Sequence, residues 1–147
     1  MKIYFAGSIR GGRQDQEIYF SIINELTKYG TVLTEHIGQK NLSEKGEQNL
    51  TEQFIFERDM AWVREADVLV GEVTAPSLGV GYEIGQAESM DKKILLLYRS
   101  VEGKKLSAML LGNTKVKVAQ YETFDDARAI LAEYFDAIGQ PKTSEFL

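Results

Sequence analysis

Two carboxylates are the first candidates for chemistry: Glu83, inside a small and otherwise apolar helix start, and Asp59, on the apolar stripe of a predicted helix. Glu83 follows the glycine-containing segment PSLGVG, so we expect it to project from the start of a helix toward the rim of a crevice. Asp59 shares a predicted helix face with Ile55 and Val63 at i, i+4 and i+8 spacing, on the stripe that should face the sheet. Two carboxylates in different surroundings are what glycosidic cleavage needs, one as nucleophile and one as acid.

Each carboxylate also has a structural explanation at this stage. Glu83 could merely complement the positive end of its helix dipole, a surface effect of about 0.3–1 kcal/mol. An unpaired buried carboxylate is unfavourable, so Asp59 could instead be paired with Arg58 or Arg64 of a neighbouring chain. The side chains that surround the two carboxylates must decide between these alternatives.

Two glycine-containing segments could bring backbone close to a ligand. GSIRGGR (7–13) follows the first predicted strand and leads into the first helix, and PSLGVG brings Ser77, Gly79 and Gly81 to the start of a later helix. Glycines allow close approach, and a helix N-terminus favours an anion. GSIRGGR is neither the dinucleotide fingerprint nor the phosphate-binding loop of ATPases, so the sequence indicates neither NAD nor ATP.

Tyr4 and His36 lie at the ends of the first two predicted strands, where a parallel sheet binds its ligands. Most strand tyrosines serve packing, so the position of Tyr4 alone gives it no role. A lone histidine is more often a structural residue than a catalyst, so His36 is a candidate for ligand contact only.

The composition bounds the function. The chain has 147 residues, is 44% hydrophobic and 27% charged, and contains no cysteine and one histidine. One globular domain is expected, and disulfides, thiolate catalysis and metal sites built from cysteine or several histidines are excluded. The net charge of −5 argues against a protein that grips a nucleic-acid polymer but permits a small anionic ligand. No apolar segment reaches the ~18 residues of a membrane span, and we expect a cytoplasmic protein without a cleaved signal.

Strands and helices alternate along the chain, which predicts one doubly wound α/β domain with helices on both faces of a parallel sheet. Five strands fit the flavodoxin-like order 2-1-3-4-5, with the ligand at the carboxyl ends of the strands near the first and third. We expect the domain to span residues 1–136, followed by a tail at 137–147. The predicted strands are 2–6, 31–34, 67–73, 93–98 and 115–121, the helices are 13–29 (ended by Gly30), 51–66, 76–90 and 123–136, and 37–50 is a loop.

The ordered motifs are similar to those of a known family. YFAGSIRGGR, YGTVLTEH, RDMAW, ADVLVGEVTAPSLGVGYEIG and LSAML resemble the 2′-deoxynucleoside 5′-monophosphate N-hydrolases (Rcl), a branch of the nucleoside 2-deoxyribosyltransferase superfamily. The resemblance covers residues 2 to about 136 and departs mainly in the 37–53 segment and the tail. It implies hydrolysis of the N-glycosidic bond of a deoxynucleoside monophosphate, without a metal or other cofactor, to a free base and 2-deoxyribose 5-phosphate.

The resemblance also implies roles for individual residues. Glu83 matches the nucleophile that forms a deoxyribosyl ester, Asp59 the residue that helps to protonate the departing base, and Tyr4 a tyrosine that orients the nucleophile. Ser77 and Gly79 match phosphate contacts. The remaining matched positions fall into two groups. Ser107, followed by Ala108 and Met109, matches the segment that completes the site of the neighbouring subunit in a homodimer. The pocket around sugar and base includes Gly7, Ser8, Ile9, Arg10, Gly11, Gly12, Arg13, Tyr19 and His36. Independently of the resemblance, we expect Ile9 to lie against C2′, because it is the only large aliphatic side chain of GSIRGGR and would disfavour a 2′-hydroxyl.

Other functions remain open on the sequence. A nucleoside 2-deoxyribosyltransferase would form the same ester but pass the sugar to a second base, although the serines at positions 77 and 107 favour a phosphorylated substrate. A cytidylate-type ribonucleotide hydrolase belongs to the same superfamily. A non-enzymatic nucleotide-binding domain would share the fold, but it would not require Tyr4, Asp59 and Glu83 together.

Overall fold

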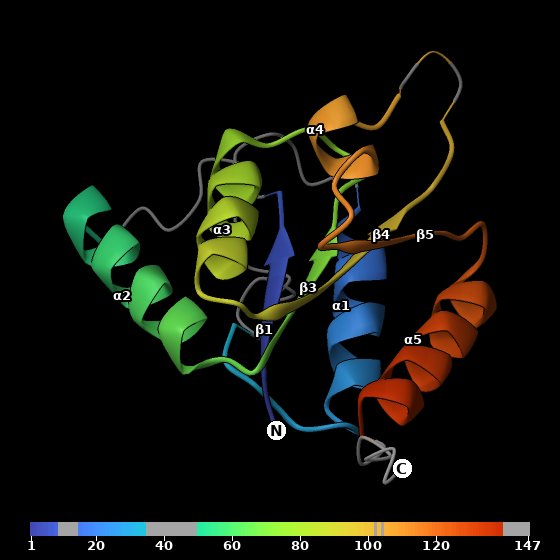
Figure 1. Cartoon of the computed structure of the whole chain (residues 1–147), viewed down its shortest axis with the longest axis horizontal. Coiled ribbons are helices and arrows are strands. Elements are labelled where there is room, and N and C mark those ends of the chain that lie inside the picture. Colours follow the sequence, from blue (N-terminus) through green and yellow to red (C-terminus); the bar gives the residue numbers. More distant parts are fainter. Residues whose placement is uncertain (9–14, 35–49, 102, 104, 140–147) are drawn as a thin grey trace, which may run out of the picture.

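The computed structural model describes residues 1–8, 15–34, 50–101, 103 and 105–139. Within these ranges five parallel strands form one sheet in the order β2-β1-β3-β4-β5, which confirms the predicted fold class and strand order (Figure 1). In chain order the elements are β1 (Lys2–Gly7), α1 (Gln16–Leu26), β2 (Thr31–Val32), α2 (Glu52–Glu65), β3 (Val68–Glu72), α3 (Leu78–Ser89), β4 (Lys93–Tyr98), α4 (Ala108–Leu111), β5 (Lys117–Gln120) and α5 (Phe124–Gly139).

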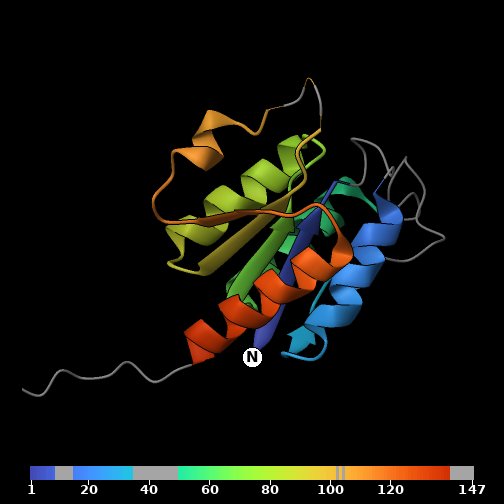
Figure 2. The same cartoon turned by 90° about the vertical axis from the view of Figure 1, so that its right-hand side faces the viewer.

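The central strand β1 sends successive side chains to opposite faces of the sheet. Ile3 and Phe5 pack in a core cluster with α1 and α5, whereas Tyr4 and Ala6 pack in a second cluster with α2 and α3. Figures 1 and 2 show these helices as layers on either side of the strands. The sheet therefore separates two core clusters, one beneath α1 and α5 and one beneath α2 and α3.

Four helices begin at a hydroxyl side chain that accepts a hydrogen bond from the first turn. At the start of α5, Thr123 accepts from the N–H of Asp126. Thr51 accepts from the N–H of Phe54 at the start of α2, and Ser77 accepts from the N–H of Val80 at the start of α3. Ser107 does the same for α4. Such N-caps satisfy backbone donors that have no partner within the helix, so these hydroxyls fix where each helix starts.

The end of α1 differs from the prediction. The helix ends at Leu26 rather than at residue 29, with Thr27 at the C-cap, so Gly30 is not its terminator. A Cβ at Gly30 would lie 2.2 Å from the carbonyl oxygen of Met1. The glycine is therefore needed because the chain passes close to the N-terminus as it enters β2. At the other end of the chain, α5 continues to Gly139, past the predicted end at 136.

The second strand is shorter than predicted, and one helix was not predicted at all. The strand consists of Thr31–Val32. Beyond it the N–H of Leu33 donates to the C=O of Ile3, and the Thr34 hydroxyl bonds both the N–H and the C=O of Phe5, each at 2.7 Å. The unpredicted helix is α4, a single turn that begins within the LSAML motif and ends at Leu111. The predicted loop at 37–50, apart from Leu50, and the start of the first predicted helix lie outside the described residues.

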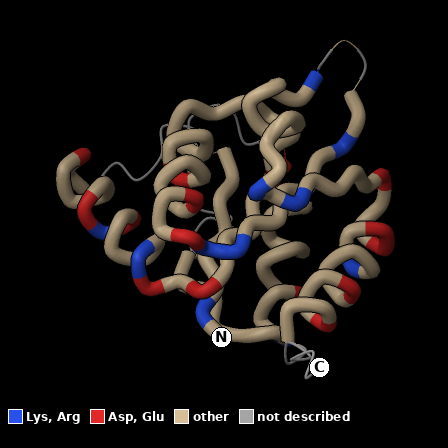
Figure 3. Tube along the Cα trace, in the orientation of Figure 1, with Lys and Arg blue, Asp and Glu red and all other residues tan. Residues whose placement is uncertain are grey.

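Charged residues of both signs are interspersed over α2, and α5 carries mostly acidic ones (Figure 3). Among the described residues, none of the helices has the length and apolar character needed to cross a bilayer.

Candidate active site

The structure brings Tyr4, Asp59 and Glu83 together from three elements. Glu83 lies in the second turn of α3, Tyr4 on the β1 face that packs against α2 and α3, and Asp59 on α2. The Tyr4 hydroxyl, almost completely buried, hydrogen-bonds to the Glu83 carboxylate, and Asp59 lies close enough to interact with both groups electrostatically. The two carboxylates that the sequence indicated therefore share one site between α2 and α3.

Glu83 is held in surroundings that disfavour its charge. Burial raises the pKa of Glu83 to about 8, repulsion from Asp59 adds to the increase, and the hydrogen bond from Tyr4 opposes it. Burial and the two carboxylates also raise the pKa of Tyr4, so its hydroxyl stays protonated and donates. Around neutral pH the Asp59–Glu83 pair therefore retains a proton, as expected for two carboxylates that interact strongly.

Asp59 has a partner of its own in the same chain. Its Oδ1 accepts from both Nε and Nη2 of Arg58 at 3.0 Å, and its side chain is 20% exposed. The Arg58 guanidinium in turn lies 4.8 Å from the ring centroid of Trp62. Asp59 is therefore paired with Arg58 of its own chain, whereas the sequence suggested an arginine of a neighbouring chain, and this pair lies beside Glu83. The carboxylates consequently differ in surroundings, since one faces a cation and the other an anion and a phenol.

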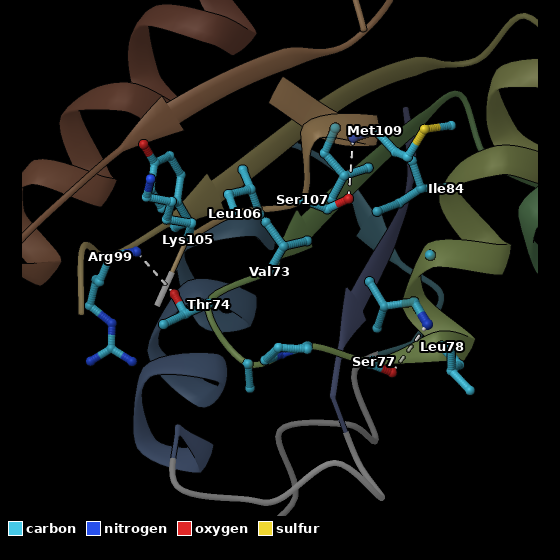
Figure 4. A pocket seen from close by; sticks show the side chains of 16 residues that line it. Val73, Thr74, Ser77, Leu78, Ile84, Arg99, Lys105, Leu106, Ser107 and Met109 are labelled. Carbon is cyan, nitrogen blue, oxygen red and sulfur yellow. Dashed lines mark hydrogen bonds between the residues drawn. The ribbon is translucent and has the colours of Figure 1, made fainter. Parts of the chain in front are cut away.

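A cleft of about 640 Å³ lies on the other side of α3, between that helix and α4 (Figure 4). Ser77 and Ser107 both line it, as do Gly81 and Ile84 of α3. Tyr4, Asp59 and Glu83 are not among its lining residues. Within one chain, Ser107 and Glu83 therefore face opposite sides of α3, whereas Ser77 stands at the N-terminus of that helix. The other lining residues are Val73, Thr74, Ala75, Pro76, Leu78, Val80, Tyr98, Arg99, Lys105, Leu106, Met109 and Leu110.

The predicted sugar and base pocket is described only in part. Gly7 ends β1, where a Cβ would lie 3.0 Å from the Tyr19 ring. Tyr19 is fully buried in the α1 core cluster, and its hydroxyl accepts from the N–H of Ser8 at 3.2 Å. Tyr19 thus contacts the backbone at the start of the glycine-rich segment. The predicted residues Ile9, Arg10, Gly11, Gly12, Arg13 and His36 lie outside the described residues.

The residues predicted from the other two motifs lie at helix starts. Gly79, in the first turn of α3, is exposed and would admit a Cβ in ordinary contact with the Ser77 hydroxyl. Ala108 and Met109 open α4, and the Met109 side chain is 81% exposed. In the described parts of the chain, no group of three or more histidine, aspartate and glutamate side chains is arranged to hold a metal ion.

A second polar cluster, which sequence reasoning missed, lies on the α1 side of the sheet. Glu72, fully buried at the end of β3, accepts hydrogen bonds from the Tyr121 hydroxyl and, at 2.7 Å, from the N–H of Thr74. Arg99 places its Nε 3.9 Å from Glu72 and pairs with Asp15 through Nη2. We call these five residues the Glu72 cluster. The signal was a carboxylate inside the apolar segment VLVGEV, which needs partners when buried.

A family model described as nucleoside 2-deoxyribosyltransferase matches residues 3–134. The chain belongs to this family. Among its relatives, the 5-hydroxymethyl-dUMP N-hydrolase of Danio rerio is 49% identical over 140 residues, which cover 94% of this chain and 98% of that protein. The expected resemblance to the N-hydrolase branch of the nucleoside 2-deoxyribosyltransferase family is confirmed by this similarity.

Two solved structures share the fold of this nucleoside 2-deoxyribosyltransferase family member. The CMP N-glycosidase of Clostridium botulinum aligns with a TM-score of 0.62 at 19% identity, covering 90% of this chain and 99% of that one. The 2-deoxyribosyltransferase of Bacillus psychrosaccharolyticus aligns with a TM-score of 0.63 at 21% identity, covering 87% and 90%. At these identities the two structures establish the fold alone.

Proposed function

We propose that the chain is a cytoplasmic enzyme that hydrolyses the N-glycosidic bond of 2′-deoxynucleoside 5′-monophosphates, releasing a free base and 2-deoxyribose 5-phosphate. The observation that carries the proposal is the Tyr4–Asp59–Glu83 site, in which two carboxylates in different surroundings lie together. The name of the Danio rerio relative supports the same substrate class. The cysteine-free composition supports the location, because cytoplasmic proteins do not depend on disulfides.

The proposed reaction proceeds in two displacements. Glu83 attacks C1′ while the C1′–N bond breaks, and Asp59 gives its proton to the departing base. Water then attacks C1′ of the glutamyl ester, Asp59 takes a proton from that water, and Glu83 leaves as a carboxylate. A carboxylate suits both steps because the transition states resemble an oxocarbenium ion. The Tyr4 hydroxyl holds Glu83 in place through its hydrogen bond.

The shared proton of the two carboxylates fits this division of roles. Catalysis needs one ionised nucleophile and one protonated acid, which together hold one proton. The raised pKa of Glu83 means that the pair keeps this proton up to about pH 8. When the substrate arrives, the developing positive charge at C1′ favours the ionised form of Glu83, which places the proton on Asp59 for transfer to the base.

The phosphate has a proposed site at the N-terminus of α3. Backbone N–H groups and the helix dipole favour an anion there, and Gly79 leaves the first turn open. Ser77 accepts the capping hydrogen bond from Val80, and a serine hydroxyl that accepts still has a proton to donate. Ser77 can therefore cap the helix and bind phosphate at the same time.

We further propose a homodimer in which Ser107 completes the partner's site, together with Ala108 and Met109. Within one chain Ser107 faces the α4 side of α3, away from Glu83. Large apolar side chains are exposed around these helices, among them Leu78 at 96% and Met109 at 81%, as in a surface that a second subunit covers.

The dimer can be tested by complementation. Glu83→Ala and Ser107→Trp chains, each inactive alone, should regain activity when mixed, because one site of each mixed dimer carries neither change. Random mixing at equal ratio gives about a quarter of wild-type sites in working order. Subunit exchange is demonstrated separately with labelled chains, and no recovery despite exchange would mean that each site lies within one chain.

One assay tests the reaction itself and separates its rivals. The protein is incubated with dGMP, 5-hydroxymethyl-dUMP, deoxyguanosine and CMP, with and without a second free base, and products are separated by chromatography. We expect free base from the deoxynucleoside monophosphates and a strong preference over deoxyguanosine, because binding energy from the phosphate positions the sugar. Transfer to the added base would favour a transferase, release from CMP a ribonucleotide hydrolase, and binding without turnover a non-catalytic domain.

A further inference from the structure

Arg99 connects three segments at the carboxyl edge of the sheet. Its backbone N–H donates to the Thr74 hydroxyl at 2.9 Å, in the turn between β3 and α3. Its guanidinium pairs with Asp15, the residue before α1, and lies 5.8 Å from the ring centroid of Tyr121 after β5. One side chain and its backbone thus hold the starts of α1 and α3 against the end of the sheet.

Both contacts border the proposed substrate site. Thr74 lies in the same turn as Ser77, the proposed phosphate ligand, and Figure 4 shows Arg99 bonded to Thr74 with Ser77 further along that turn. Asp15 directly follows segment 9–14, and Ser8, on the other side of that segment, is held by the Tyr19 hydroxyl. The described residues that flank the glycine-rich segment are therefore each tied to a side chain, Ser8 to Tyr19 of α1 and Asp15 to Arg99, which directly follows β4.

Stability alone does not account for the Glu72 cluster. Buried ion pairs contribute little net stability because desolvation offsets their attraction, and apolar packing of similar volume often does better. The Arg99 Nε is itself buried without a hydrogen-bond partner, and lies 3.9 Å from the Glu72 carboxylate. What such a network provides is a fixed geometry, since a guanidinium offers donors in a planar fork of set direction.

We propose that Arg99 is a positioning residue for the N-hydrolase reaction, which sets Asp15 at the start of α1 and the Ser77 turn relative to one another. Arg99 does so without touching the reacting atoms, because Glu83 lies on the opposite face of the sheet. The inference rests on the proposed function. Small misplacements of binding groups far from the reacting bond can lower a rate by about a hundredfold, so the expected effect is measurable.

The main test is Asp15→Asn, which leaves the contact between Arg99 and Glu72 in place. We expect kcat/KM for dGMP to fall about tenfold or more, with the pH dependence of kcat/KM unchanged. The kcat/KM of Arg99→Gln should fall at least as far, and Arg99→Lys should lose less than Arg99→Gln. The double variant Asp15→Asn/Arg99→Gln should have the same kcat/KM as Arg99→Gln alone, because both changes remove the same contact. The matched control is Arg128→Gln on α5, which removes an arginine that also pairs with carboxylates and lies 4.9 Å from the Phe124 ring centroid.

A binding measurement separates this inference from the proposed function. In a Glu83→Gln background, which should bind dGMP without cleaving it, Asp15→Asn should weaken calorimetric binding of dGMP about tenfold. Wild-type protein that binds dGMP but releases no base would refute the proposed function while this comparison still stands. Values of kcat/KM and Kd within twofold of the parent, a moved pH profile, or an equal loss in Arg128→Gln would each overturn the role of Arg99.

Discussion

The two faces of the sheet hold the same chemical pair with different access. On the α3 side, Glu83 accepts a hydrogen bond from Tyr4, and on the α1 side Glu72 accepts one from Tyr121. Burial raises the pKa of both carboxyls. Glu72, however, is fully buried, whereas Glu83 keeps part of its surface exposed. A tyrosine–glutamate pair is therefore not a catalytic signature by itself.

The charged neighbours separate the two pairs further. Asp59 lies beside Glu83 and repels its charge, while Arg99 lies 3.9 Å from Glu72 and attracts it. The backbone N–H of Thr74 is a second donor to Glu72. The Glu72 carboxylate thus accepts its hydrogen bonds from groups inside the protein, whereas the partly exposed Glu83 carboxylate can also accept one from a ligand. The proposed reactivity of Glu83 therefore rests on its exposed surface and on the neighbouring Asp59 carboxylate, not on the residue types.

The largest expected difference between the two faces of the sheet is in the effect of a glutamate-to-glutamine change on turnover. Glu83→Gln should lower kcat for dGMP by at least ~10³-fold, because it removes the proposed nucleophile without changing its volume. Glu72→Gln should lower kcat/KM by about tenfold to a hundredfold, through misplaced binding groups alone. Steady-state release of base measures both. Equal losses in the two variants, with both proteins folded, would erase the distinction between the two faces.

The free energy of unfolding should change in opposite directions in Glu83→Gln and Glu72→Gln. The folded pKa of Glu83 lies above its unfolded value, so the folded protein binds more protons between about pH 4.5 and 8 and loses stability as pH rises through that window. Glu83→Gln lacks this loss and should raise the free energy of unfolding at pH 8 by about 1–3 kcal/mol, with little change at pH 5. Glu72→Gln should lower it by about 1–3 kcal/mol, because a buried amide N–H₂ would face other donors. Urea denaturation of each variant at the two pH values checks both signs.

The smallest expected difference is in how Tyr4→Phe and Tyr121→Phe change the pH dependence of kcat/KM. If the active pair holds one proton, kcat/KM should fall above about pH 8 as that proton is lost. Tyr4→Phe removes a hydrogen bond that lowers the pKa of Glu83, so the descending limb should move up by about half to one pH unit. Tyr121→Phe should leave the limb where it is. A profile that instead rises through pH 8 would show that only an ionised Glu83 is needed, without a proton on Asp59.

The fold could be predicted from the sequence because its signals are local. Apolar strands that alternate with helical periodicity gave the five-stranded order, and serine or threonine marked the true starts of α2 and α3. The end of α1 could not be predicted this way, since Gly30 is required by a contact with Met1 that no local pattern shows. The single turn of α4 is too short to show periodicity.

In the candidate site, too, local signals could be predicted and tertiary contacts could not. Glu83 could be identified because it stands in a small, apolar helix start, and Asp59 because it shares a helix stripe with apolar residues. The motifs then paired them with Tyr4. Glu72 carries the same signal in an apolar strand. Its partner Arg99 directly follows β4, the strand beside β3, so the pairing depends on strand order and on which face each side chain takes. Whether a buried carboxylate faces a cation or another anion is a tertiary property.

Ser107 lines a cleft that Glu83 does not line, and the proposed homodimer that brings the two residues into one site has a consequence in dilute solution. A site that needs residues from two chains exists only while the chains are associated. The rate per chain then falls as the protein is diluted below the dissociation constant of the dimer, where the number of complete sites varies with the square of the protein concentration. The amount of protein present would thereby set not only how many chains there are but also what fraction of them can act.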